Sequence, residues 1–232
     1  MLWNNHSELK GKHAFLSPSG YTWINYSDDE LFEKLTNKYS SYIRTPIGTA
    51  IHKYAASQIL LKQKPGKGIN TLIKNIKNYL QAQNDFAIEN DINPPYSEEF
   101  INYVGMLPEH VYQTVILYIT DCISFNMISE KELKFSDNCF GTTDAISFNN
   151  NTLRISDLKT GDIEAHIEQL YIYAALFCLE YHYRPTEIKI EFRLYQYGMI
   201  KEVTDPSVET ITKIMDRITL SNKMTDKIRG KE

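Results

Sequence analysis

Two segments of alternating hydrophobic and polar residues, 141–148 and 152–159, are separated by three consecutive asparagines. Alternation of this kind is typical of β-strands, and asparagine runs are typical of turns, so the sequence predicts a β-hairpin. If residues 149–152 form a four-residue loop, Asp144 pairs with Asp157 across the hairpin. Residues two apart share one face of a strand, so Lys159 lies on the same face as both carboxylates.

The two opposed carboxylates require a compensating positive charge, because like charges that face each other destabilise a sheet. A divalent cation suits this position, since Mg²⁺ commonly takes one or two carboxylates and completes its shell with water and phosphate. The pattern favours metal-assisted hydrolysis, with the Lys159 ammonium orienting or deprotonating water or stabilising charge on phosphorus. The alternative makes Asp144 a turn residue and pairs Asp157 with Lys159 in an ordinary surface ion pair, which stabilises little.

The rest of the pattern predicts an α/β domain with a mixed sheet. Helical periodicity and capping signals predict helices over residues 27–42, 50–63, 69–83, 108–125, 163–182 and 206–223. Alternation predicts further strands over residues 132–136 and 187–197. Residues 1–126 are therefore mainly helical, and residues 127–232 hold the sheet core and the C-terminal helix. A chain of 232 residues requires no more than this one domain.

The composition is that of a globular protein, with 42% hydrophobic and 23% charged residues. No apolar run is long enough to cross a bilayer, and the N-terminus lacks the basic start and apolar stretch of a secretory signal, so we expect a cytoplasmic protein without a membrane partner. The three widely spaced cysteines predict no disulfide framework, zinc site or iron–sulfur cluster.

Positive charge is concentrated in the first half of the chain, although the net charge is −4. No acidic residue occurs between Glu33 and Asp85, a segment that is rich in lysine. Such a segment can follow a phosphate backbone, because Lys and Arg contacts release condensed counterions whatever the base sequence. The alternative is an ordinary solvated helical face. The candidate DNA-binding residues are Arg44, Lys53, Lys62, Lys64 and Lys67.

Four short motifs follow one another in a familiar order. Ile47-Gly48-Thr49-Ala50-Ile51-His52 comes first, then Phe140-Gly141-Thr142-Thr143-Asp144-Ala145-Ile146, then Asp157-Leu158-Lys159-Thr160-Gly161, and then Gln169 with Tyr173. Together they resemble the successive motifs of the RecB-like branch of the PD-(D/E)XK nucleases, which includes CRISPR-associated exonucleases and relatives carried by phages. The resemblance covers roughly residues 48–173, and the conjunction of motifs is more specific than any one of them.

The resemblance implies a restriction-endonuclease-like core, a mixed sheet flanked by helices behind a helical N-terminal half. It also implies a role for each matched residue. His52, Asp144, Asp157 and the backbone carbonyl of Leu158 would bind Mg²⁺ or Mn²⁺, Lys159 would be the catalytic lysine, and Gln169 and Tyr173 would steady the substrate or the active site. The cysteines that hold an iron–sulfur cluster in some members are missing, which favours the shorter phage-type relatives.

The residues themselves leave simpler interpretations open. His52 has small and apolar neighbours on its helix and resembles a satisfied core histidine. Gln169 and Tyr173 share a helix face and could form a half-buried polar seam. The aromatic residues between Phe15 and Trp23 could stack on single-stranded bases, although core packing is the better explanation.

The expected function is a metal-dependent DNA exonuclease of recombination, repair or phage replication. Its expected partners are the single- or double-stranded ends of DNA, and a recombination or single-strand-binding protein. The alternatives are a structure-specific endonuclease with the same hairpin and a non-catalytic DNA-binding or recombination-partner module with the same fold.

Overall fold

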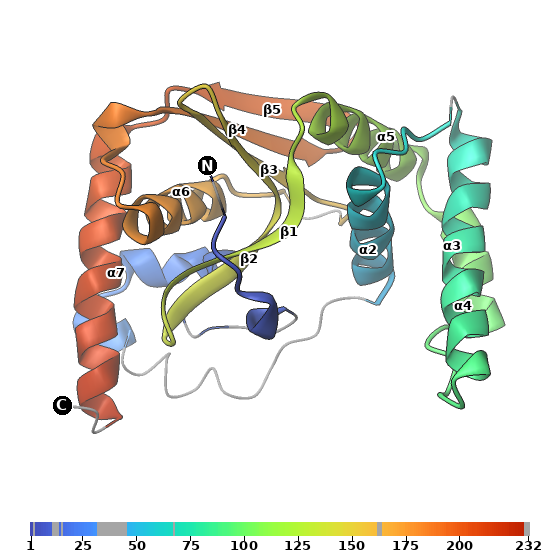
Figure 1. The fold of residues 1–232 in the computed structure, drawn as a ribbon, viewed down its shortest axis with the longest axis horizontal. Helices are drawn as coiled ribbons and strands as arrows, with labels where there is room; N and C mark the ends of the chain where they lie inside the picture. The colour runs from blue at the N-terminus through green and yellow to red at the C-terminus, as the bar shows by residue number, and fades with distance from the viewer. Residues whose placement is uncertain are drawn as a thin grey trace.

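The fold is built on a five-stranded mixed sheet flanked by helices, as the sequence predicts (Figure 1). The structure is a computed structural model that describes residues 1, 3–10, 14, 16–31, 46–66, 68–161 and 164–229. The strands are β1 (Ile128–Ser136), β2 (Cys139–Asn149), β3 (Thr152–Leu158), β4 (Lys189–Gln196) and β5 (Met199–Thr204), in that spatial order. β3 and β4 are parallel, and the other neighbouring strands are antiparallel.

The predicted hairpin forms in the predicted register. Phe148 pairs with Leu153 and Ile146 pairs with Ile155. The prediction of a four-residue loop is wrong, because residues 149 and 152 pair with each other and only Asn150 and Asn151 form the turn. Both have positive φ, 50° and 58°, as the two central residues of a type I′ turn must. Asparagine tolerates this conformation better than most residues, which explains the asparagines at this point.

Five of the six predicted helices are present, with bounds that differ from the predicted ones. The structure has α2 (Pro46–Leu60), α3 (Ile69–Glu89), α4 (Glu98–Tyr103), α5 (Glu109–Ser124), α6 (Glu168–Tyr181) and α7 (Val208–Ile228). Short 3-10 helices are η1 (Ser7–Leu9), η2 (Pro18–Asn25), η4 (Val104–Met106) and η5 (Pro185–Glu187). Residues 28–31 are helical, and the rest of the helix predicted over residues 27–42 lies outside the described residues.

Several predicted boundaries are corrected. α2 starts at Pro46, four residues before the predicted start, because proline suits the first turn of a helix. It ends at Leu60, and Lys62 then takes a φ of 52°. α6 begins at Glu168, not at residue 163. α4 and β5 were not predicted, because both are short and have little hydrophobic periodicity.

Two hydrophobic cores lie on opposite faces of the sheet. One joins the sheet to α6, α7 and η2 and contains Ile146, Ile155 and Phe177. Leu16 and Trp23 are buried in this core, so this part of the N-terminal aromatic stretch packs inside the protein. The other core joins the sheet to α2, α3 and α5. It contains Ile51, Leu72, Ile76, Val115, Ala145 and Leu158.

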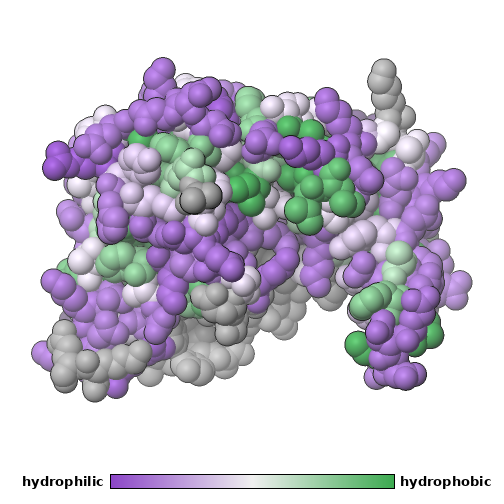
Figure 2. Space-filling view, in the orientation of Figure 1, coloured by the Kyte–Doolittle hydropathy of each residue, from purple (hydrophilic) through white to green (hydrophobic). Residues whose placement is uncertain are grey.

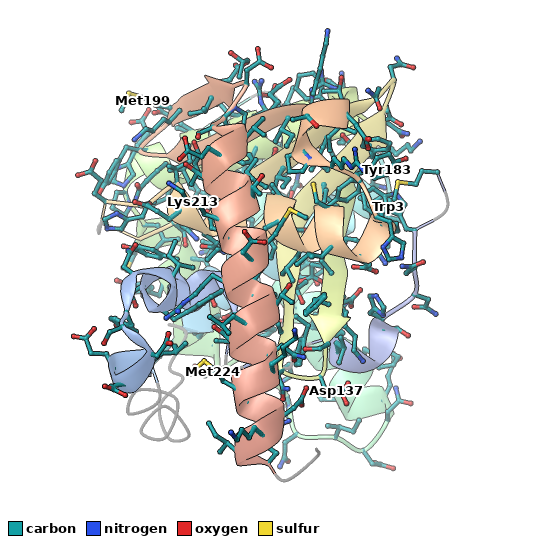
Figure 3. The ribbon with its side chains drawn as sticks, turned by 90° about the vertical axis from the view of Figure 1, so that its left-hand side faces the viewer. Trp3, Asp137, Tyr183, Met199, Lys213 and Met224 are labelled. Atoms are coloured by element: carbon teal, nitrogen blue, oxygen red, sulfur yellow. The ribbon has the colours of Figure 1, made fainter. Side chains whose placement is uncertain are left out.

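The outer surfaces differ from one end of the molecule to the other. α7 runs along the outside of the α6 layer, with Lys213 and Met224 along its length (Figure 3). The face in Figure 2 is mainly hydrophilic, and apolar residues gather at the lower end of α3, where Phe86 and Ile88 are exposed. In the described part of the chain, no helix combines the length and apolar character needed to span a membrane.

Gly141 allows η2 to approach β2 closely. A Cβ atom added at this position would lie 2.6 Å from Cδ of Pro18 and 3.3 Å from Cε1 of Tyr173. The proline ring cannot rotate away, so Gly141→Ala is expected to lower the free energy of unfolding by about 1–3 kcal/mol, measured by urea denaturation. Gly161→Ala is the matched control, because a Cβ there meets nothing within 4 Å. Equal stability of the two variants would contradict the proposed contact.

Candidate active site

The predicted pair of Asp144 with Asp157 is not among the paired residues of β2 and β3. The paired residues of the hairpin end at Ala145 and Ser156, one step before the two aspartates. Asp144 there turns its side chain toward β3, and its Oδ2 accepts a hydrogen bond of 2.8 Å from the backbone N–H of Leu158. Asp157 is buried, with only 2% of its surface exposed. The hairpin therefore brings the carboxylate of Asp144 to the strand that carries Asp157.

His52 reaches this point from α2. Its neighbours Ile51 and Ala55 are buried in the core under the helix, which leaves His52 at the helix edge, half-buried. Nδ1 of His52 lies 3.2 Å from Oδ1 of Asp144. His52 is thus neither a simple core residue nor a surface residue. It faces Asp144, and the family resemblance implies that both residues bind the metal.

Lys159 connects the carboxylates to α6. Its backbone N–H donates to the carbonyl of Tyr195 on β4, at 2.9 Å, so the residue is held just beyond the end of β3. Its Nζ lies 3.1 Å from Oδ1 and 2.8 Å from Oδ2 of Asp157. The same Nζ donates to Oε1 of Gln169, at 3.1 Å. The ammonium group therefore points toward the hairpin carboxylates, as the predicted register requires.

Gln169 and Tyr173 extend this set of contacts to β2. Nε2 of Gln169 lies 3.5 Å from the hydroxyl of Tyr173, a long contact that contributes little by itself. The Tyr173 hydroxyl donates to the backbone carbonyl of Thr142, two residues before Asp144. Tyr173 is buried in the hydrophobic core and is not half-buried, as the alternative of a polar seam proposed. Gln169 is half-buried and also reaches Lys159.

Gln196 fixes the connection between Lys159 and α6. Its side-chain amide donates to the carbonyl of Gly161 and accepts from the backbone N–H of Ala165, both at 2.9 Å. One buried side chain at the end of β4 therefore holds both ends of this connection. α6 begins three residues after Ala165, at Glu168.

Burial and charge act in opposite directions on the two aspartates. Burial opposes ionisation of Asp144, but His52, Lys159 and the Leu158 N–H together lower its pKa to about 2. Burial raises the pKa of Asp157, and the attraction of Lys159 offsets this only in part because Asp144 adds repulsion. The site thus holds one firmly ionised carboxylate beside one that depends on a nearby cation for its charge.

A cleft of about 740 Å³ is lined by His52, Asp144, Leu158 and Tyr173 from this set. Its lining does not include Asp157, Lys159 or Gln169. One wall is α2, with Thr49, His52 and Lys53, and the opposite wall is the N-terminal segment around Pro18. β2 forms the floor from Phe140 to Asp144. The cleft is large enough for a small-molecule ligand or part of a polymer.

The predicted DNA-binding residues divide into three groups. Lys53 lines the cleft. Lys62 and Lys64 are exposed beyond the end of α2 and are not part of the cleft lining, and Lys62 donates to Oδ1 of Asn126. Arg44 and Lys67 lie outside the described residues.

The donor atoms suit a hard divalent cation, but they are not arranged as a finished site. Among the described residues, no group of three or more His, Cys, Asp or Glu side chains is placed to hold a metal ion. His52 faces Asp144, and Lys159 faces Asp157, so each carboxylate already has a partner. Two carboxylates and one imidazole are nevertheless ligands that Mg²⁺ or Mn²⁺ accepts. The donor chemistry therefore fits such an ion.

One family model matches the chain over residues 13–193, and its description is "Protein of unknown function (DUF2800)". The chain belongs to the DUF2800 family. The matched region contains all of the site residues from His52 to Tyr173. It ends at residue 193, within β4, so Gln196 lies outside it. No solved structure gives a significant match to the chain.

Three further residues of this DUF2800 chain were not predicted at the site. Lys10 and Glu130 line the cleft, and buried Tyr118 of α5 lies under it. Tyr118 packs edge-on against Tyr195 at 5.3 Å, and burial raises its pKa, with smaller contributions from Cys122, Asp144 and Asp157. Glu130 was missed because β1 was expected to begin only at residue 132, and no sequence motif marks Lys10 or Tyr118.

Proposed function

We propose that this DUF2800 chain is a metal-dependent deoxyribonuclease that removes nucleotides from DNA ends. The observation that supports the proposal best is the contact of Lys159 with both Asp157 and Gln169, beside Asp144 at the floor of the cleft. A lone surface ion pair would not be joined by an amide from a separate helix. This combination is the one that the PD-(D/E)XK resemblance implies for the catalytic residues.

The roles of the residues follow from their positions. His52, Asp144, Asp157 and the carbonyl of Leu158 would hold Mg²⁺ or Mn²⁺, which when bound activates water and polarises the phosphoryl oxygen. Lys159, held by Asp157 and Gln169, orients the attacking water and offsets negative charge on the phosphate. Gln169 and Tyr173 fix Lys159 and β2 relative to each other. Attack of water on phosphorus breaks the phosphodiester bond, leaving a phosphate monoester and a free hydroxyl group.

Exonuclease action is proposed over its alternatives, with recombination, repair or phage replication in the cytoplasm as the setting. A recombination or single-strand-binding protein is the proposed protein partner. The same hairpin would equally serve a structure-specific endonuclease, which would also cut closed circles. A non-catalytic DNA-binding module would bind DNA without cutting it.

The decisive experiment compares wild type with Lys159→Met on linear and covalently closed circular DNA, single- and double-stranded, in Mg²⁺, Mn²⁺ or EDTA. Wild type is expected to degrade only linear DNA and only with metal. Lys159→Met is expected to cleave about 10²–10³-fold more slowly, as when one preorganised stabilising group is removed from a transition state.

Lys189→Met is the matched control, because Lys189 is an exposed lysine on β4 outside the cleft. It is expected to retain wild-type activity. Metal-dependent cutting of closed circles would replace exonuclease with endonuclease. Binding of DNA without cleavage in either metal would favour the non-catalytic module.

A further inference from the structure

The N-terminal segment is fixed at one end and enters the cleft at the other. Trp3 packs edge-on against Phe177 and Tyr181 of α6, with ring centroids 5.7 and 5.6 Å apart. Figure 3 shows Trp3 close to Tyr183, just beyond the end of α6. His6 lies 2.6 Å from the carboxylate of Glu180. These contacts anchor residues 3–6 on α6, and the chain then continues through η1 (Figure 1).

Lys10 follows η1 and lines the cleft, where its Nζ lies 3.0 Å from Oε2 of Glu130. The side chain of Lys10 is 66% exposed and that of Glu130 is 30% exposed. Solvent-exposed ion pairs stabilise a fold very little, because water and salt screen the attraction. The pair is therefore easily exchanged for another partner of suitable charge.

Glu130 lies at a gap in the pairing of β1 with β2. Ser129 pairs with Ala145 and Lys131 pairs with Thr143, so the unpaired Glu130 falls opposite Asp144 in the register. Glu130 has a φ of 48°, outside the extended range of a strand, and it lines the cleft, where a carboxylate repels a polyanion. Lys10 is the cation that the structure places against Glu130.

We propose that Lys10 is a phosphate-binding residue whose site Glu130 occupies when no DNA is bound. A phosphodiester group of the DNA entering the cleft replaces the carboxylate of Glu130 as the partner of Lys10. This inference rests on the proposed function, because it requires DNA to enter the cleft. It adds a phosphate contact on the N-terminal wall, opposite Lys53 on α2, outside the matched motifs.

The exchange predicts opposite effects for the two members of the ion pair. Binding of a fluorescein-labelled 20-nucleotide single strand and of a 20-base-pair duplex is measured by anisotropy at several salt concentrations, with Ca²⁺ in place of Mg²⁺. Lys10→Ala is expected to weaken binding about threefold to tenfold and to reduce the slope of log K against log[salt] by about 0.7–0.9, as for one lost phosphate contact. Glu130→Gln is expected to tighten binding about twofold to fivefold, because it removes a competitor for Lys10.

Lys189→Ala removes the same charge from an exposed position on β4 and is expected to leave the salt slope unchanged. Thermal unfolding of each variant confirms that the fold is intact. If the pair only held the N-terminal segment in place, both substitutions would break it and both would shift affinity in the same direction, which would overturn the inference. Unchanged affinity of both variants would overturn it too. Failure of the wild type to bind either DNA would instead overturn the proposed function itself.

Discussion

Asp157→Asn is expected to abolish metal-dependent DNA cleavage, with a loss of roughly 10⁴-fold or more. Groups that act as a unit in catalysis lose nearly all activity when one is removed. Asparagine keeps the shape of the side chain but removes the negative charge, which the proposed Mg²⁺ or Mn²⁺ and the ammonium of Lys159 both require. The expected loss exceeds that of Lys159→Met, because Asp157 contacts Lys159 and is also a proposed metal ligand.

The measurement is the initial rate of nucleotide release from linear DNA in Mg²⁺ and in Mn²⁺. Asp157→Asn should fold as well as wild type, since burial already disfavours the charged carboxylate. Asp216→Asn, an exposed aspartate on α7, is the matched control and should retain full activity. Activity of Asp157→Asn within tenfold of wild type would remove Asp157 from the catalytic site and with it the proposed mechanism.

The hairpin could be predicted from the sequence because its register depends on local information. A run of asparagines fixes the turn, and a period of two fixes the face on which every side chain lies. Even the wrong loop length left the register unchanged, because the two-residue turn and the four-residue loop share the same pairing of Phe148 with Leu153. The contact of Lys159 with Asp157 follows from the period of two, because residues two apart share one face of a strand.

The other half of the cleft could not be predicted because it depends on contacts between distant segments. Lys10 and Glu130 are 120 residues apart in the sequence, and neither belongs to a recognisable motif. Gln196 likewise acts on a connection more than thirty residues earlier in the chain. The short strand β5 and helix α4 were missed for a different reason. Packing against neighbouring elements determines their secondary structure, and their sequences lack the periodicity that predicts it.

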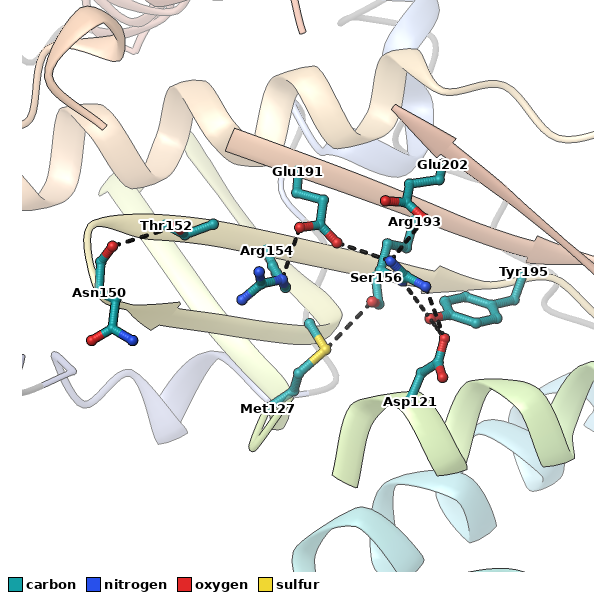
Figure 4. A network of polar contacts seen from close by, with 10 residues as sticks. All are labelled: Asp121, Met127, Asn150, Thr152, Arg154, Ser156, Glu191, Arg193, Tyr195 and Glu202. Carbon is teal, nitrogen blue, oxygen red and sulfur yellow. Dashed lines mark hydrogen bonds and ion pairs between the residues drawn. The ribbon is translucent and has the colours of Figure 1, made fainter. Parts of the chain in front are cut away.

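A polar cluster around Arg193 lies behind the β2–β3 hairpin (Figure 4). The guanidinium of Arg193 lies 3.0 Å from Asp121, 2.9 Å from Glu191 and 3.0 Å from Glu202. Its Nε donates to the hydroxyl of Tyr195, at 3.0 Å, and only 10% of the Arg193 side chain is exposed. Arg193 thus contacts carboxylates from α5, β4 and β5. It lies on β4, the strand whose Tyr195 carbonyl accepts from the backbone N–H of Lys159.

Arg193→Met is expected to lower the free energy of unfolding by about 3–5 kcal/mol, measured by urea denaturation. Methionine fills most of the volume but leaves the carboxylate of Asp121 partly buried without its cation, whereas Glu191 keeps the guanidinium of Arg154 at 2.8 Å. Removing one partner of a buried ion pair is strongly destabilising. Glu202 contributes less, because its side chain is 45% exposed. Arg184→Met is the matched control, since Arg184 is 82% exposed and should change stability by less than about 0.5 kcal/mol.

A second substitution separates lost charge from lost packing. Arg193 also stacks over the ring of Phe125, at 4.9 Å, so a smaller side chain could destabilise the protein through this contact alone. If uncompensated charge is the cause, Asp121→Asn in the Arg193→Met background should recover stability, because it removes one of the repelling carboxylates. The same substitution in wild type should destabilise, because Arg193 and Tyr195 then lose a charged partner. If Asp121→Asn destabilised both backgrounds equally, packing would account for the loss and Arg193 would not act as the cation that holds this cluster together.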